Sequence, residues 1–165
     1  MIQESINNIA VLPTHARVWA FQSSKPLTGE MRAEIDGQLT EFLSSWAAHG
    51  LSLMTAYEIR FDRFIIIAVD EEVAQATGCS IDGMMRTVQG IDSQYELDLL
   101  NRMKVAYRKG EDIVECDVNE FASMLANGEA TSSTPVFNNV VQSVAELNEA
   151  WETTVDKSWH ANLLP

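Results

Sequence analysis

The sequence predicts an α+β fold, and three observations favour it. Apolar residues recur at helical spacing in two long stretches, 29–49 and 80–95. Short runs with the composition of strands flank both stretches, and the run at 64–69 is the most apolar of them. These signals follow one another in the order β-α-β-β-α-β, which is the order of a split βαβ unit.

The first strand is predicted at 16–21, and a turn at 25–28 follows it. Thr28 stands where a residue that caps a helix is expected. The helix is predicted to end at Gly50, because glycine is favoured just beyond a helix C-terminus. Its apolar positions recur every three or four residues: Met31, Ile35, Leu39, Phe42, Leu43 and Trp46.

Two strands, at 53–61 and 64–69, follow and are joined by a tight turn at 62–63. The second of them is apolar on both faces, so we expect it at the centre of the sheet. A helix at 80–95 comes next. Its inward side is predicted from apolar residues at helical spacing: Ile81, Met84, Met85, Val88 and Ile91.

A hairpin is predicted over 104–117, with its turn at Gly110 and Glu111. This turn fixes a register that pairs opposite charges across the strands. The charge pairs are Lys109 with Asp112 and Lys104 with Asp117, and the same register places Cys116 opposite Val105. This placement leads us to interpret Cys116 as a core residue.

The remaining chain is predicted as helix, linker, strand and helix. The helix begins after Asp117, which has the spacing of a capping residue, and it ends at Gly128. The segment 128–135 is typical of a linker. A strand at 136–141 and a helix beginning after Ser143 complete the chain.

Together these elements predict a ferredoxin-like split βαβ sandwich with an extra strand and a C-terminal helical extension. The main unit is expected to cover residues 1–128. The extension, 129–165, is expected to pack on it, giving a single domain overall.

The charge and apolar content of the sequence restrict the kinds of molecule that the protein can be expected to bind. The formal net charge is −13, and residues 110–165 hold ten acidic residues but one basic residue, Lys157. Nucleic acids and anionic membranes bind through Lys and Arg, so we expect neither as a partner. A basic or apolar protein, or a small ligand, fits better. The longest apolar run, 64–69, is far shorter than the roughly twenty residues of a membrane span.

The compartment is predicted from the N-terminus and the cysteines. Residues 1–16 contain no Lys or Arg, whereas a secretory signal begins with cationic residues. Two cysteines do not form a disulfide framework. We therefore expect a cytoplasmic protein.

Cys79 is the first candidate for chemistry, since it lies at or just before the start of the 80–95 helix. Helix N-termini favour thiolates, which permits a nucleophilic or redox role. The alternative is a small buried residue in a strand-to-helix turn. His49 and His160 are the candidate bases for such a thiol. The spacings of these three residues match no metal or catalytic signature, so neither a metal site nor a cofactor is predicted.

Other candidates have structural alternatives. Ser80 fits a phosphate-binding turn or, better, a plain helix cap. Trp46 and Trp159 are candidate ligand contacts. The structural alternative for the C-terminus is an anchored tail, with Trp159 in a groove and His160 in water. His49 is expected at the end of the first helix. The run at 70–72, Asp-Glu-Glu, fits either a Mg²⁺ site or the capped first turn of a helix.

Several segments together resemble a family of small uncharacterised proteins from Bacteroidetes-type bacteria. They are Arg17-Val18-Trp19, Trp46-Ala47-Ala48-His49-Gly50, Arg63-Phe64-Ile65, Gly78-Cys79-Ser80-Ile81-Asp82, Val136-Phe137-Asn138-Asn139 and Ser158-Trp159-His160. Members often carry the label "ABC transporter ATPase". This chain contains no Gly-x4-Gly-Lys-Ser/Thr, so the label has no support in the sequence, and the family supplies no established catalytic residue.

We therefore expect a non-enzymatic binding or assembly module. The alternative is a thiol-dependent enzyme or redox sensor that uses Cys79 with His49 or His160. A P-loop ATPase is not expected.

Overall fold

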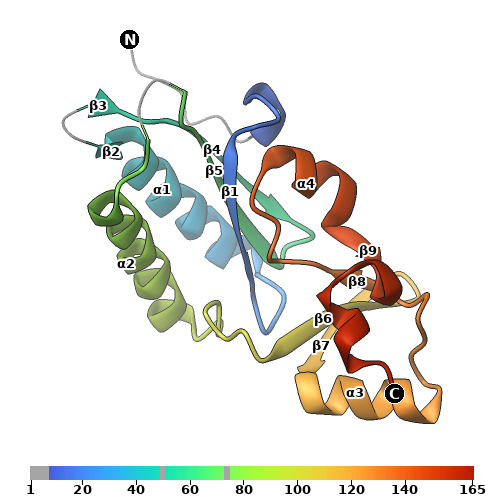
Figure 1. The fold of residues 1–165 in the computed structure, drawn as a ribbon. Coiled ribbons are helices and arrows are strands. Elements are labelled where there is room, and N and C mark those ends of the chain that lie inside the picture. Colours follow the sequence, from blue (N-terminus) through green and yellow to red (C-terminus); the bar gives the residue numbers. More distant parts are fainter. Residues whose placement is uncertain (1–7, 49–50, 73–74) are drawn as a thin grey trace. The chain divides into compact units, whose positions relative to one another are not determined.

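The computed structural model describes residues 8–48, 51–72 and 75–165, and it divides the chain into two compact units (Figure 1). The first unit comprises Met1–Leu100 with Gln142–Ala145. The second comprises Asn101–Val141 with Glu146–Pro165. The predicted α+β class is confirmed, since helices accompany antiparallel sheets. The predicted boundary after residue 128 does not coincide with this division.

The first unit is built on an antiparallel sheet of three strands, β1 (Arg17–Gln22), β4 (Met54–Arg60) and β5 (Phe64–Asp70). Their order is β1-β5-β4, so β5 is central, as predicted. Residues 64–69 of β5 are all buried. The antiparallel strand β5 thus lies between the two strands that α1 connects, which is the split βαβ arrangement.

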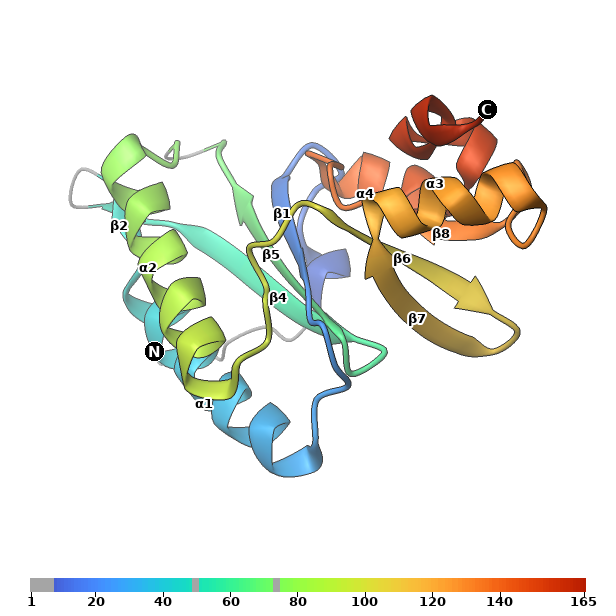
Figure 2. The ribbon, with the colours of Figure 1, turned by 90° about the horizontal axis from the view of Figure 1, so that it is seen from below.

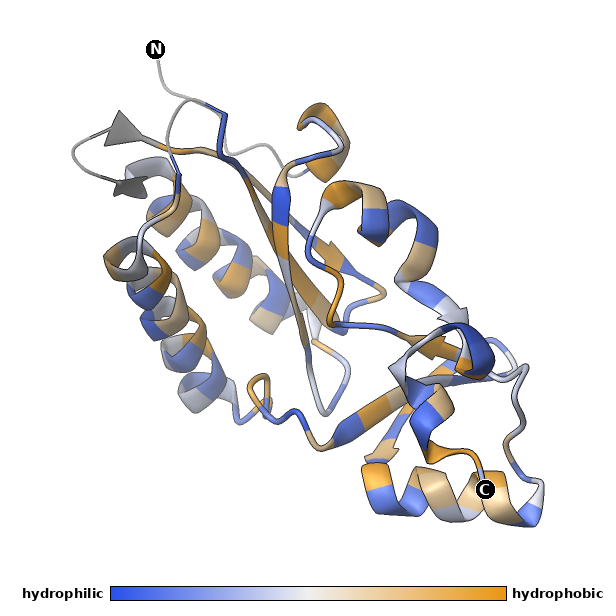
Figure 3. Cartoon of the chain, viewed as in Figure 1, coloured by the Kyte–Doolittle hydropathy of each residue, from blue (hydrophilic) through white to orange (hydrophobic). Residues whose placement is uncertain are grey.

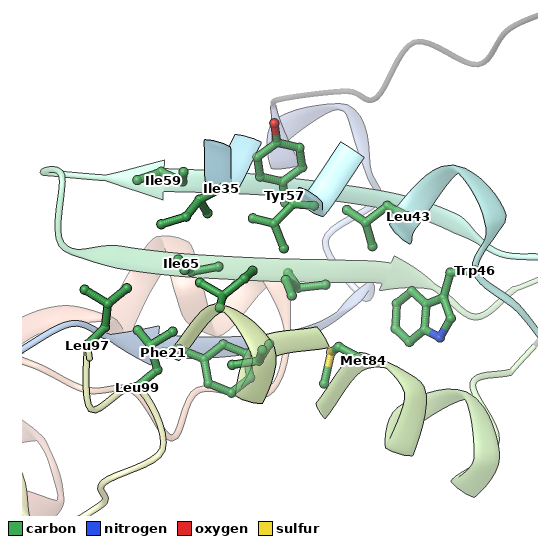
Figure 4. Packing of buried hydrophobic residues seen from close by; sticks show 14 of the residues in the cluster. Phe21, Ile35, Leu43, Trp46, Tyr57, Ile59, Ile65, Met84, Leu97 and Leu99 are labelled. Atoms are coloured by element: carbon green, nitrogen blue, oxygen red, sulfur yellow. The ribbon is translucent and has the colours of Figure 1, made fainter. Parts of the chain in front are cut away.

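Two helices cover one face of this sheet, α1 (Gly29–Ser45) and α2 (Gly78–Tyr95) (Figure 2). Both alternate apolar and polar residues along their length, as expected of helices with one buried side (Figure 3). Between sheet and helices lies a core that includes Ile35, Tyr57, Ile65 and Met84 (Figure 4). The unit also holds a short turn of helix, η1 (Ile9–Val11), and a small ladder of β2 (Ala47–Ala48) and β3 (Leu51–Ser52).

The end of α1 differs from the prediction. Thr28 caps its start as expected, accepting a hydrogen bond from the Met31 N–H at 3.2 Å. The helix ends at Ser45, however, with Trp46 as C-cap. The Trp46 indole is buried and donates a hydrogen bond to the Ser80 carbonyl at 2.8 Å. This tertiary contact stops the helix before Gly50, which lies outside the described residues.

The outer edge of β1 is covered by a segment from far along the chain. The Val18 N–H donates to the Gln142 carbonyl at 3.1 Å, and the Val144 N–H donates to the Ala16 carbonyl at 2.9 Å. A bridge joins Arg17 to Ser143. The strand that follows α2, β6, does not join this sheet and pairs within the second unit.

The sheet of the second unit has four strands in the order β7-β6-β8-β9. They are β6 (Lys104–Lys109), β7 (Asp112–Asp117), β8 (Pro135–Phe137) and β9 (Glu152–Thr154). The predicted hairpin register is confirmed: Lys109 lies opposite Asp112, and Cys116 opposite Val105. Gly110 supplies the positive φ, +66°, that the turn needs. The strand predicted at 136–141 is shorter than expected, and β9 was not predicted.

Helix α3 (Val118–Asn127) is capped by Asp117 and ends at Gly128, both as predicted. The segment 128–135 is more ordered than a linker, since Ala130 is buried and its N–H donates to the Met124 carbonyl at 3.0 Å. The chain continues through α4 (Val144–Ala150), η2 (Val155–Lys157) and η3 (Trp159–Leu163). Among the described residues, no helix combines the length and apolar character needed to cross a bilayer.

Candidate functional site

The N-terminus of α2 is closed by its own hydroxyl groups. Thr77 is the N-cap, and its Oγ1 accepts from the Ser80 N–H at 3.2 Å. The Ser80 Oγ accepts in return from the Thr77 N–H at 2.6 Å, which completes a capping box. Ser80 is therefore the third helical residue and not the cap. Its buried hydroxyl is engaged in the helix end.

Cys79 is exposed at the second residue of α2. The interpretation of this cysteine as a buried packing residue is therefore wrong. Its thiol makes no hydrogen bond or ion pair with the residues that the structure describes. His49 lies outside the described residues, and His160 belongs to the second unit. The pairing of this thiol with either imidazole thus stays a prediction.

Trp46 is a core residue of the first unit, only 4% exposed. Its ring packs against Phe42 at 5.4 Å and against Trp19 at 6.0 Å between centroids. Together with the indole hydrogen bond to Ser80, these contacts give Trp46 a structural role. The candidate ligand contact at Trp46 is therefore a side chain of the core.

His160 is fully buried in the second unit, so the alternative of an anchored tail with His160 in water is wrong. Its ring stacks on the half-buried Trp159 at 3.9 Å and meets the edge of Phe121 at 6.3 Å. The Ser158 Oγ lies 2.6 Å from its Nδ1. Its Nε2 has no hydrogen-bond partner among the described residues. Burial lowers the pKa of His160 to about 4, so the imidazole is neutral at physiological pH.

Cys116 is buried as predicted. Burial raises the pKa of its thiol to about 11, with a smaller contribution from the nearby Glu120 and Asp117 carboxylates. At neutral pH the thiol is protonated, so Cys116 is a poor nucleophile.

At the end of β5, the structure adds His15 to the acidic run that the sequence had singled out. Asp70 does not cap a helix: its Oδ1 accepts from the Glu72 N–H at 3.0 Å within a turn. The His15 Nε2 lies 3.4 Å from the same Asp70 oxygen. His15, Asp70 and Glu72 each offer one potential ligand atom, a ring nitrogen or a carboxylate oxygen. These three atoms all lie within 4.8 Å of one another. The three residues are therefore close enough to act on one bound ion.

The side chain of Glu71, the remaining acidic residue of the run, contacts other groups. Its Oε2 accepts from the Ala76 N–H at 3.0 Å, and its Oε1 lies 3.8 Å from an Arg17 guanidinium nitrogen. The acidic run at 70–72 was the sequence signal for this place. His15 carried no such signal, because its approach depends on the pairing of β1 with β5.

Comparison of the chain with protein-family models, with curated proteins and with solved structures finds no match. The resemblance to the Bacteroidetes family therefore stays a prediction.

Proposed function

We propose that the protein is a cytoplasmic, non-enzymatic binding or assembly module. One observation carries the proposal: most side chains expected to perform chemistry are built into the fold. Ser80 closes a helix end, Trp46 lies in the core and His160 is enclosed by aromatic rings. A catalytic group must be reachable by its substrate. The two unpaired cysteines are consistent with a reducing compartment.

The exposed charge favours a basic protein as partner. In residues 110–165 the single basic residue is Lys157, and Arg108 of the preceding strand pairs with Glu152 at 2.6 Å. A surface of one sign attracts partners of the other sign and speeds their association. The exposed carboxylates in this part of the chain are those of Glu111, Asp112, Glu120, Glu129, Glu146, Glu149, Glu152 and Asp156.

The test is affinity capture from an extract of the source cells, with the full chain immobilised. We expect a basic protein in a stoichiometric amount at low salt and its loss at high salt. Neutralising Glu146 and Glu149 to glutamine should weaken capture. The matched control neutralises Glu30 and Glu41, which are equally exposed on α1. Equal capture by both variants, or no capture by the native chain, would refute the proposal.

A thiol-dependent enzyme or redox sensor is the second candidate, and the exposure of Cys79 at a helix N-terminus favours it. The test is the pH dependence of Cys79 alkylation in a Cys116→Ser background, with and without His49→Ala and His160→Ala. An apparent thiol pKa well below the free value of about 8.5, rising when one histidine is removed, would favour this function. A reaction identical to that of free cysteine would exclude it.

A further inference from the structure

We propose that His15, Asp70 and Glu72 form a binding site for a divalent first-row transition-metal ion, with Zn²⁺ as the ion of choice. This proposal does not rest on the proposed binding of a protein partner. The sequence leaves Mg²⁺ at residues 70–72 as one of two alternatives and predicts no metal site that includes a histidine.

The fold brings these ligands together from two distant parts of the chain. Strands β1 and β5 are antiparallel, with Arg17 opposite Val69. The residues before β1 therefore lie beside those after β5, and His15 reaches Asp70 across this junction. A buried strand pair holds both backbones, so the approach of imidazole to carboxylate is set by the sheet.

The distance between the His15 and Asp70 ligand atoms fits coordination of a shared ion. A charge-assisted N–H···O bond is usually about 2.7–2.9 Å long, whereas the His15 Nε2 and the Asp70 Oδ1 are 3.4 Å apart. Two ligand atoms on a tetrahedral Zn²⁺, each bound at roughly 2.1 Å, lie about 3.4 Å from one another. Glu72 supplies a third ligand atom within 4.8 Å of the other two, so a small side-chain movement completes the set.

The local charge also fits a dication. The two carboxylates together carry two negative charges, which a divalent ion neutralises. Arg17, the nearby cation, contacts other groups: its guanidinium lies 4.7 Å from the centre of the Trp19 ring and 3.8 Å from the Glu71 carboxylate.

The chemical types of the three ligands, one imidazole and two carboxylates, determine which ion the site prefers. Mg²⁺ and Ca²⁺ prefer oxygen ligands throughout, whereas imidazole suits zinc and its neighbours in the first transition row. Three protein ligands leave a fourth position for water. The His15 side chain is 62% exposed, so this position is open to solvent.

The experiment uses the untagged full chain. Zn²⁺ binding is measured by titration calorimetry, and Co²⁺ is added separately because its visible absorption reports coordination geometry. We expect one ion per chain, a tetrahedral Co²⁺ spectrum and no competition from millimolar Mg²⁺. His15→Ala and Glu72→Gln should each weaken Zn²⁺ binding at least about tenfold, since even the loss of an outer-shell partner costs 10–100-fold.

Control variants distinguish this site from other residues of the chain that could bind Zn²⁺. Glu71→Gln removes a neighbouring carboxylate that is not a ligand, and it should leave Zn²⁺ affinity unchanged. His49→Ala, His160→Ala and Cys79→Ser should do the same. The proposal fails if the native chain binds no Zn²⁺, if His15→Ala binds it normally, or if one of the last three variants abolishes binding. Each variant is checked by circular dichroism, and His15 and Glu72 are exposed enough for their replacement to preserve the fold.

Discussion

The cores of the two units differ in their chemistry. The core of the first unit is largely aliphatic around β5, with Ile65, Ile67 and Val69 directed toward the helices. In the second unit the aromatic ring of Phe121 contacts both Tyr107 and the imidazole of His160. The first core is held mainly by burial of apolar surface, which is insensitive to pH. The second includes a group that acid can charge, so its stability is linked to protonation.

The largest expected effect is the loss of a core ring. Phe121→Ala should destabilise the second unit by about 3–5 kcal/mol, because the side chain is fully buried and leaves a cavity. Ile67→Ala, the matched change in the first unit, should cost about 2–5 kcal/mol. Urea unfolding gives these values. Hydrogen exchange should show faster exchange in β6 and β7 for Phe121→Ala, and in β1 and β4 for Ile67→Ala. If the same amides exchange faster in both variants, the two units unfold together and their cores do not act independently.

Acid should act on the second unit through His160. Its pKa is about 4 in the folded protein and about 6.5 when unfolded. The fold therefore favours the neutral imidazole, and this stability is fully present above pH 6.5. It is lost as the pH falls from 6.5 toward 4, by roughly 3 kcal/mol in total. The check is the free energy of unfolding measured across this range.

His160→Phe is the control for that measurement, because it keeps a ring beside Trp159 but does not titrate. Carboxylates also protonate in acid, so the difference between the native chain and the variant isolates the imidazole. The native protein should lose more stability than the variant between pH 6.5 and 4. Parallel pH profiles would show that His160 is not held neutral by the fold.

Smaller and nearly equal effects are expected at two helix caps, one in each unit. Thr77→Ala removes the acceptor of the Ser80 N–H, and Asp117→Ala removes the acceptor of the Asn119 N–H. Each change should cost about 1 kcal/mol, measured by thermal or urea unfolding. A clearly larger loss for Thr77→Ala would mean that the capping box also holds the Trp46 contact in place. A loss near zero for either variant would contradict the assigned cap.

Local features were predictable from the sequence. The hairpin at 104–117 and its register follow from Gly110 in the turn and from the charged residues on either side of it. All of these residues lie close together in the sequence. The caps Thr28 and Asp117, and the stop at Gly128, likewise depend on a few adjacent residues. The central place of β5 follows from its unbroken apolar run.

Features that depend on contacts between residues far apart in the sequence were not predictable. The end of α1 is set by the Trp46 hydrogen bond to Ser80, and β9 forms because Thr153 pairs with Val136. The burial of His160 depends on Phe121, which lies far away in sequence. The same limit applies to the candidate metal site: its acidic half was visible as a run at 70–72, but the strand pairing that adds His15 was not.

The covering of β1 by residues 142–145 has a consequence during synthesis on the ribosome. Strands β1, β4 and β5 all leave the ribosome well before Gln142 does, so the sheet forms with one edge of β1 still open. At roughly 5–20 residues per second, that edge waits on the order of several seconds for its partner. An exposed strand edge invites pairing with other nascent chains. The interval before residue 142 emerges is therefore when the β1 edge is most open to such pairing.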